Sequence, residues 1–166
     1  MHPVCRYAAG TRQTAPRPWC KSLCARKRMK MKHDKSLTDD ASDLNHTSYG
    51  NGVKHFNRGD FKSAKREFEV ALEYWPEDPQ AWFALGNCFN ELKKPARAEK
   101  CFRTALKYGS EEKKSDAYFN LGNSLYDQDK YEAAIECYTK VSAQSSAYAV
   151  AQRNLKRAKD ALSTST

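Results

Sequence analysis

The sequence is short of glycine, proline and long apolar stretches, and each shortage excludes a class of protein. Seven glycines and six prolines in 166 residues exclude collagen-like and Pro/Gly-rich low-complexity chains. No apolar run approaches the roughly 18 residues that a membrane-spanning helix requires. The sequence also lacks a glycine-rich phosphate-binding loop and a Gly-x-Ser-x-Gly nucleophile motif. The length allows one or two small domains with a hydrophobic core.

Acidic residues are absent from the first 33 positions, which contain nine basic side chains. The whole chain has 29 basic and 20 acidic residues, so residues 34–166 hold 20 of each and are neutral overall. The net charge of +9 therefore belongs to the N-terminal segment, and the remainder offers no global positive field for a polyanion. Prolines and the lack of an apolar period predict that residues 1–44 form a disordered basic tail.

The tail is open to several interpretations. Its arginine-rich, acid-free start is typical of organellar transit peptides, but it also fits a nuclear localisation cluster or a segment upstream of a true start at Met29 or Met31. It could equally have no dedicated role. A secretory signal is not indicated, because no apolar core of 7–15 residues follows the positive start. We expect an intracellular, cytoplasmic protein, or an organellar or nuclear one if the tail is a targeting signal.

Cysteine and histidine are too sparse to indicate a disulfide scaffold or a metal site. The six cysteines divide equally between the tail and the rest of the chain: Cys5, Cys20, Cys24, Cys88, Cys101 and Cys137. We expect the last three to be reduced and buried, because they lie on apolar helix faces. Cys20 and Cys24 have no second pair at zinc-ligand spacing, and the histidines have no suitable partners. We expect no metal and no cofactor.

The body of the sequence contains an internal repeat. Glycine, alanine and aromatic positions recur at the same spacings of 34 and then 36 residues: Gly52, Gly86, Gly122; Ala64, Ala98, Ala134; and Phe68, Phe102, Tyr138. Agreement across independent positions indicates three units of one architecture.

Each unit is predicted to be a pair of antiparallel helices. In the second unit, one apolar face recurs at helical spacing: Trp82, Leu85, Phe89 and Leu92. A second stripe follows: Ala98, Phe102 and Ala105. Asp78 and Pro79 supply an N-cap and a first helical residue. Gly109 is expected to end the second helix in a left-handed conformation.

These residues resemble the tetratricopeptide repeat family, whose pattern runs Trp-x-x-Leu-Gly-x-x-Tyr and then Ala, an aromatic, Ala and Pro. The second unit matches at seven positions and departs at the proline, where it has Ser110: Trp82, Leu85, Gly86, Phe89, Ala98, Phe102 and Ala105. The resemblance implies an all-α fold, a right-handed helical-repeat solenoid of three helix pairs at 45–78, 79–112 and 115–148. An amphipathic capping helix at 149–162 is expected to cover the end of the stack.

The sequence contains no catalytic constellation, so we expect a non-catalytic adaptor rather than an enzyme. The resemblance implies a concave groove lined by the first helix of each repeat, in which a peptide or helix of a partner protein binds. The candidate groove positions combine aromatic anchors with amides that can pair with a peptide backbone: Tyr49, Val53, Phe56, Phe83, Asn87, Asn90, Phe119, Asn120, Asn123 and Tyr126. Phe83 and Phe119 could instead pack against the following repeat.

Two alternative functions remain. In the first, the tail associates with a polyanion, either nucleic acid or an anionic membrane surface, and the repeats hold a protein partner. In the second, the repeats clamp the acidic C-terminal tail of a heat-shock chaperone, as some family members do with lysines and asparagines. The matching positions starting from repeat one lack those lysines: Tyr49, Val53, Ala84, Asp116 and Asn120. The missing charge disfavours the clamp.

Overall fold

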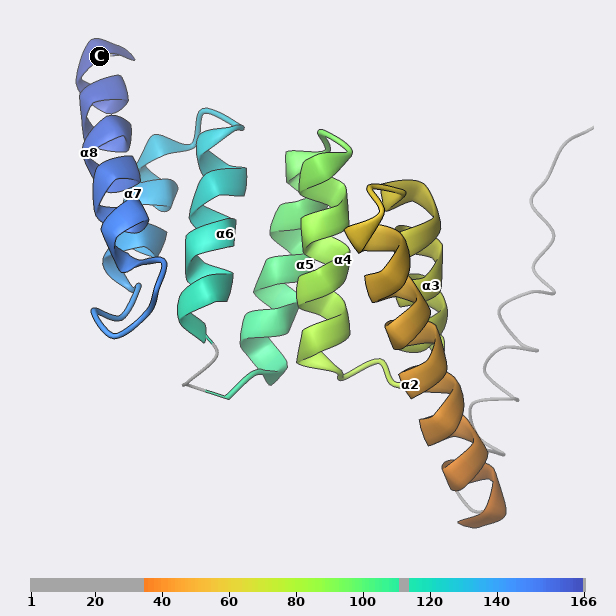
Figure 1. The fold of residues 1–166 in the computed structure, drawn as a ribbon. Helices are drawn as coiled ribbons and strands as arrows, with labels where there is room; N and C mark the ends of the chain where they lie inside the picture. The colour runs from red at the N-terminus through yellow and green to blue at the C-terminus, as the bar shows by residue number, and fades with distance from the viewer. Residues whose placement is uncertain (1–34, 111–113, 166) are drawn as a thin grey trace, which may run out of the picture. The chain divides into compact units, whose positions relative to one another are not determined.

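The chain divides into two compact units, residues 1–38 and 39–166, and the second contains the helical repeats. The computed structural model describes residues 35–110 and 114–165, with side chains at 46–110 and 114–164. Residues 1–34 of the expected disordered tail lie outside the described residues. Within the described ranges the secondary structure is entirely helical (Figure 1): α2 (Lys35–Asn57), α3 (Phe61–Tyr74), α4 (Pro79–Glu91), α5 (Pro95–Tyr108), α6 (Lys114–Tyr126), α7 (Tyr131–Thr139) and α8 (Tyr148–Ser165).

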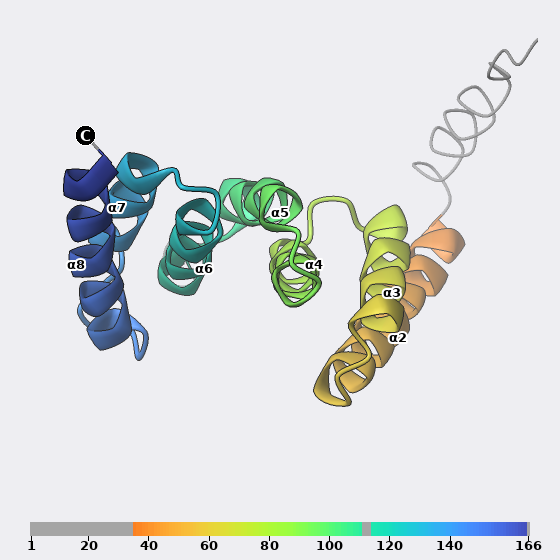
Figure 2. The same cartoon turned by 90° about the horizontal axis from the view of Figure 1, so that it is seen from above.

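The helices form three pairs, α2–α3, α4–α5 and α6–α7, followed by the single helix α8. From α3 to α8, each helix packs against the next along the chain. Helix α6 also touches α4 and α8, whereas no Cα atom of α5 lies within 8 Å of one in α3 or α7. Figure 2 shows α4, α6 and α8 in one layer and α5 and α7 in the other. The predicted all-α helical-repeat fold with a capping helix is confirmed.

One close contact holds the two helices of every pair together. A glycine of the first helix faces an aromatic ring of the second, and a Cβ added at that glycine would lie 2.6 Å from a ring carbon. The three pairs are Gly52–Phe68, Gly86–Phe102 and Gly122–Tyr138. No larger side chain fits without moving a ring at the centre of the core, which explains why glycine and the aromatic recur together.

The ends of the helices mostly follow the sequence signals. Asp78 caps α4 as predicted, since its carboxylate accepts a hydrogen bond from the backbone N–H of Gln80 at 2.8 Å, and Pro79 is the first helical residue. The prediction for Gly109 is wrong: its backbone is extended, with φ −77° and ψ 152°. An added Cβ there would meet the Ala105 carbonyl oxygen at 2.8 Å, so close backbone approach, rather than a positive φ, accounts for this glycine.

The turn within each repeat contains the left-handed residue. Gly59, Lys93 and Asp129 have φ angles of 79°, 56° and 59°, and they occupy equivalent positions between the two helices of successive pairs. Only the first of these positions is a glycine, so the sequence pattern did not reveal the shared conformation.

Helix α2 begins at Lys35, upstream of the boundary at residue 45 that we expected for the first repeat. No proline occurs between Lys35 and Asn57, and no glycine occurs between Lys35 and Tyr49. No helix-breaking residue therefore interrupts the helix before its packed C-terminal half.

Candidate functional site: a row of hollows along the first helices

Three hollows lie along the first-helix layer, and they contain most of the predicted groove residues. The largest, with a volume of about 540 Å³, lies between α2, α4 and the start of α6. We call it the central hollow, and its lining includes Tyr49, Gln80, Phe83, Lys114 and Asp116. A small hollow of about 70 Å³ lies between α2 and α4 and is lined by Val53, Phe56, Phe68, Ala84 and Asn87.

The third hollow, between α6 and α8, has a volume of about 420 Å³, and we call it the α8 hollow. It is lined by Phe119, Asn123, Tyr126, Asp127, Tyr138, Val150, Asn154 and Arg157. Eight of the ten predicted groove residues thus line one of the three hollows, the two others being Asn90 and Asn120.

The aromatic residues of the groove each pack on a ring of their own repeat. Phe83 meets Phe102 edge-on, with ring centroids 5.7 Å apart, and Tyr49 lies 5.5 Å from Phe68. Phe119 lies 6.3 Å from Tyr138. These side chains are half-buried, so one edge contacts the core while the rest lines a hollow. Each of these rings therefore contacts the core and also lines a hollow.

A second set of aromatic pairs lies at the C-terminal ends of α2 and α6. Phe56 meets Phe61 edge-on at 5.2 Å, and Tyr126 meets Tyr131 in the same way at 5.3 Å. Each pair joins the end of a first helix to the first residue of the second helix in the same repeat. Phe56 and Tyr126 are therefore fixed in place before any ligand is present, which lowers the ordering cost of binding.

The predicted amides are engaged in hydrogen bonds between repeats, which the sequence analysis did not anticipate. Asn120 donates to the Asn87 side-chain oxygen at 3.4 Å, and the Ser124 hydroxyl donates to the Asn90 oxygen at 2.9 Å. These bonds join α4 to α6. Asn90 and Asn120 therefore hold neighbouring repeats in register, and Asn87 retains its N–H₂ group on the wall of the small hollow.

Asn123 of α6 makes similar side-chain hydrogen bonds to α7 and α8. Its side-chain oxygen accepts hydrogen bonds from the Tyr138 hydroxyl at 2.8 Å and from the Asn154 amide at 2.9 Å. Burial raises the pKa of Tyr138, so its hydroxyl remains protonated and serves as the donor. With both acceptor positions used, Asn123 offers the α8 hollow only its N–H₂ donors.

Nothing in the described residues assembles a metal centre or an activated nucleophile. No group of three or more His, Cys, Asp or Glu side chains in the described ranges is placed to hold a metal ion. The three thiols of the body are free and buried, as expected. Burial raises the pKa of Cys88 and that of Cys101 to about 12 each, so both remain protonated at neutral pH and are poor nucleophiles. No helix in the described part is long and apolar enough to cross a bilayer.

Family models identify the repeats directly. Two models described as tetratricopeptide repeat match residues 49–99 and 115–142. Together with the three helix pairs and their shared glycine–aromatic contact, these matches establish the class: the chain belongs to the tetratricopeptide repeat family.

Among curated proteins, the chain is similar to the type IV pilus assembly protein PilF of Pseudomonas aeruginosa, with 32% identity over 85 residues. That match covers 51% of this chain and 33% of PilF, so the chain spans only about a third of this relative's length.

Solved structures share the fold at low sequence identity. The first TPR of Spaghetti (RPAP3), bound to the HSP90 peptide SRMEEVD, superposes with a TM-score of 0.67 at 22% identity and covers 74% of this chain and 95% of that one. The TPR2B domain of yeast Sti1, in its pHsp70 complex, gives a TM-score of 0.65 at 14% identity and covers 70% of this chain and 97% of that one.

Proposed function

We propose that this protein is an adaptor that binds an extended segment of a partner protein along its first-helix layer. Tetratricopeptide repeat proteins are generally non-catalytic interaction modules, and the structural neighbour from Spaghetti (RPAP3) was solved with a bound peptide. The observation that carries the proposal is the row of three hollows, each lined by aromatic or aliphatic side chains together with at least one side-chain amide.

The size and chemistry of the hollows suit a peptide more than a small metabolite. Aromatic anchors supply large apolar contact areas that are already fixed by their partners in the second helices. Asn87 in the small hollow and Asn123 in the α8 hollow offer N–H₂ donors, from which the carbonyl groups of an extended chain can accept hydrogen bonds. Side chains of alternating residues would then enter the hollows while the backbone crosses between them.

The two alternatives receive less support. A chaperone-tail clamp still lacks its lysines, since Tyr49 and Val53 occupy two of the clamp positions and line apolar hollows. Polyanion binding by the tail depends on residues outside the described part of the chain, so the geometry neither favours nor opposes it.

A matched pair of substitutions tests the proposal. Val53 and Val70 are exposed to nearly the same extent, 36% and 37%. Val53 lines the small hollow, whereas Val70 lies on α3 and lines none of the three hollows. Peptides selected from a random displayed library on the wild-type full chain should lose about tenfold or more in affinity for Val53→Arg, because the guanidinium fills the hollow and introduces an unpaired charge.

The Val70→Arg variant should bind the selected peptides like the wild type. Thermal unfolding of both variants controls for loss of fold. A library that yields no peptide with affinity for the wild type, or peptides equally sensitive to both substitutions, contradicts a groove on the first-helix layer.

A further inference from the structure

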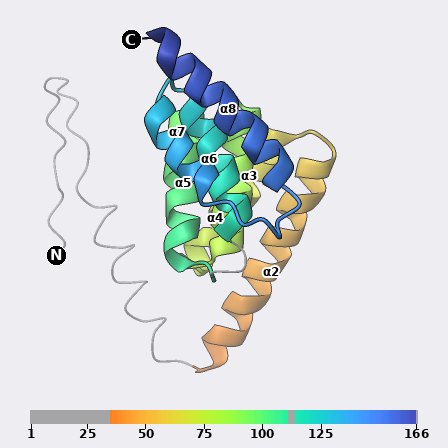
Figure 3. The ribbon, with the colours of Figure 1, turned by 90° about the vertical axis from the view of Figure 1, so that its left-hand side faces the viewer.

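Charged residues are divided unevenly among the helices. The first helices α4 and α6, one or both of which line every hollow, contain one and two charged side chains in 13 residues each. The second helices α3, α5 and α7 contain six in 14, five in 14 and two in nine. Figure 3 views the stack from its α8 end and shows α5 and α7 to the left of α4 and α6. The two helices at the centre of the groove are the least charged of the described chain.

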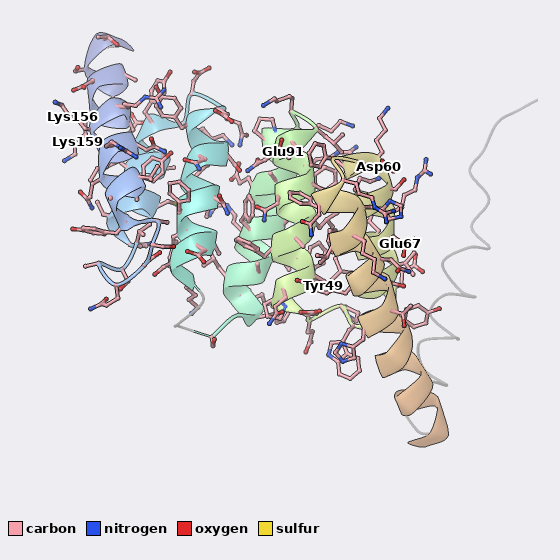
Figure 4. The ribbon with its side chains drawn as sticks, viewed as in Figure 1. Tyr49, Asp60, Glu67, Glu91, Lys156 and Lys159 are labelled. Atoms are coloured by element: carbon pink, nitrogen blue, oxygen red, sulfur yellow. The ribbon has the colours of Figure 1, made fainter. Side chains whose placement is uncertain are left out.

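The few charges of these two helices lie at their ends. Glu91 is the last residue of α4 and lines none of the hollows, and Figure 4 shows it at the C-terminal end of that helix. Lys114 and Asp116 belong to the first turn of α6. Between these ends, residues 80–90 and 117–126 contain no charged side chain. A ligand that crosses α4 and α6 therefore meets walls that are uncharged along most of their length.

The charged residues that do line the hollows cancel in each one. The lining of the small hollow contains no charged side chain. The other two linings each contain one cation and one carboxylate: Lys114 and Asp116 in the central hollow, Arg157 and Asp127 in the α8 hollow. The Asp116 carboxylate also accepts a hydrogen bond from the Ser145 hydroxyl at 3.2 Å. The Arg157 guanidinium lies 5.4 Å from the centre of the Tyr126 ring. None of the three hollows therefore presents a net charge to a ligand.

Neutral amides supply polar groups in all three hollows. Gln80 lines the central hollow and Asn87 lines the small one. Asn123 and Asn154 line the α8 hollow, where the Asn154 amide donates to the Asn123 oxygen at 2.9 Å. This bond leaves the Asn123 N–H₂ group as a donor and the Asn154 oxygen as an acceptor for a ligand. The hollows can therefore pair with neutral donors and with neutral acceptors.

Walls of this kind favour uncharged side chains over ions of either sign. An ionised side chain that leaves water for a hollow loses its hydration, and no opposite net charge in the hollow replaces it. Asn, Gln, Ser and Thr can instead exchange hydrogen bonds with water for hydrogen bonds with the amides. Apolar side chains gain free energy by leaving water. The groove therefore disfavours Asp and Glu as well as Lys and Arg.

We propose that the partner segment bound across α4 and α6 is uncharged, with apolar or aromatic side chains in the hollows and Asn, Gln, Ser or Thr beside them. The inference rests on the proposed function and names the chemistry of the partner. Charged residues of the partner then lie outside the stretch that enters the hollows. Because no net charge attracts the segment to the groove, its affinity depends little on salt.

The displayed-peptide selection supplies the first test. Peptides are kept only if they bind the wild-type full chain and fail to bind Val53→Arg, a filter that removes peptides held by the basic tail. The kept peptides should share a central stretch without Asp, Glu, Lys or Arg. Their affinity should change less than about twofold between about 50 mM and 500 mM NaCl, a range over which attraction between exposed charges is strongly screened.

A charge scan of one kept peptide is the second test. A neutral residue of the central stretch is replaced by Glu, by Lys and by Gln in three derivatives. The Glu and Lys derivatives should both bind about tenfold more weakly or worse, because either charge is desolvated without a partner. The Gln derivative, which has nearly the size of Glu, should remain within about threefold of the parent peptide.

A substitution in the protein should reverse this preference. Asn87→Asp keeps the shape of the side chain and its acceptor for Asn120 but adds a negative charge to the small hollow. The neutral peptide should weaken about tenfold on this variant, and the Lys derivative should bind it more tightly than it binds the wild type. Asn57→Asp is the matched control, because Asn57 is exposed, lines none of the hollows and should not alter either affinity. Thermal unfolding of both variants controls for loss of fold.

The outcomes separate this inference from the proposed function. Kept peptides rich in charge of one sign, or Glu and Lys derivatives with opposite effects on affinity, would overturn the uncharged segment and leave the groove intact. An affinity that falls more than about tenfold over the salt range would do the same. If no selected peptide loses binding on Val53→Arg, the groove itself is refuted, and the uncharged segment with it.

Discussion

Two glycines of α2 that look equivalent in the sequence have opposite surroundings. Each of them weakens the helix, because glycine is about 1 kcal/mol less favourable than alanine inside a helix. A Cβ added at Gly50 has nothing within 4 Å, whereas one added at Gly52 lies 2.6 Å from Cε1 of Phe68. The helical cost applies to both residues, but only Gly52 has a packing reason to be glycine.

This difference predicts opposite effects of the same substitution. Gly50→Ala should raise the free energy of unfolding by about 0.5–1 kcal/mol, since it removes backbone entropy from the unfolded chain and adds no clash. Gly52→Ala should lower it by about 1–3 kcal/mol, because the Phe68 ring must move. Urea denaturation of the two variants measures both effects, and a stabilised Gly52→Ala variant would contradict the ring contact.

Asn123, a predicted groove residue, has a structural role that the sequence did not indicate. Its position in the repeat suggested ligand binding, but its oxygen accepts the hydroxyl of Tyr138, a residue that is only 1% exposed. The first two repeats have phenylalanine at the equivalent position, Phe68 and Phe102, so they have no hydroxyl to satisfy. Sequence spacing identified the position, but the hydrogen bond joins side chains from different helices and depends on their packing.

Asn123→Ala should therefore lower the free energy of unfolding by about 1–3 kcal/mol, because it leaves a buried hydroxyl without its acceptor. Adding Tyr138→Phe should recover part of that loss. Asn87→Ala is the control, with an expected cost of about 0.5–1 kcal/mol, since its oxygen accepts a single long hydrogen bond. If Asn123→Ala lowers the free energy of unfolding by the same amount in the wild type and in the Tyr138→Phe variant, the hydrogen bond from Tyr138 to Asn123 is contradicted.

At the scale of elements, Glu99 links the second repeat to the third. This α5 carboxylate, with its side chain 15% exposed, pairs with Arg103 at 3.0 Å and with Lys130 at 2.9 Å. It also accepts a hydrogen bond from Gln128 at 3.1 Å. Lys130 and Gln128 belong to the turn between α6 and α7, so one side chain holds that turn against α5. Partial burial raises the pKa of Glu99, but these hydrogen bonds outweigh it and hold the pKa below its ordinary value of 4.5.

Glu99→Gln should lower the free energy of unfolding at neutral pH by about 0.5–1.5 kcal/mol, because the carboxylate is largely buried but its cationic partners Arg103 and Lys130 are about half exposed. Because the pKa is lower in the folded state, the stabilisation is complete above 4.5 and is lost as the pH falls through the folded value. The difference between wild type and variant should therefore shrink in acid. Glu73→Gln, at an exposed α3 residue outside the ion pairs of the described chain, is the control. A difference that is the same at neutral and acid pH would contradict this role.

Helix ends were predictable only where the signal is local. Asp78 and Pro79 are adjacent in the sequence and define their own cap, so the start of α4 could be predicted. Lys93 and Asp129 adopt left-handed conformations that neither residue type indicates. They do so because the packing of the two helices fixes the turn geometry, which then overrides the local preference of the residue.

At the scale of the whole repeat unit, residues 39–166, the fold was predictable because several independent residue positions share the same repeat spacing. Offsets of 34 and 36 residues appear in glycine, alanine and aromatic positions together, and each set marks the same helix pair. The hollows were only partly predictable: helical spacing placed the groove residues on one face, but the volumes depend on contacts between helices far apart in the sequence.

The most direct test of the account is a ¹H–¹⁵N correlation spectrum of the full chain, titrated with a peptide from the display selection. A groove on the first helices predicts that the largest chemical-shift changes fall on α2, α4 and α6 around Val53, Asn87 and Asn123, and continue onto α8 at Arg157. The second helices α3, α5 and α7 should change little on their outer sides. Changes concentrated on those second helices, with Val53 and Asn87 unaffected, would contradict the claim that this protein binds its partners through the first-helix layer.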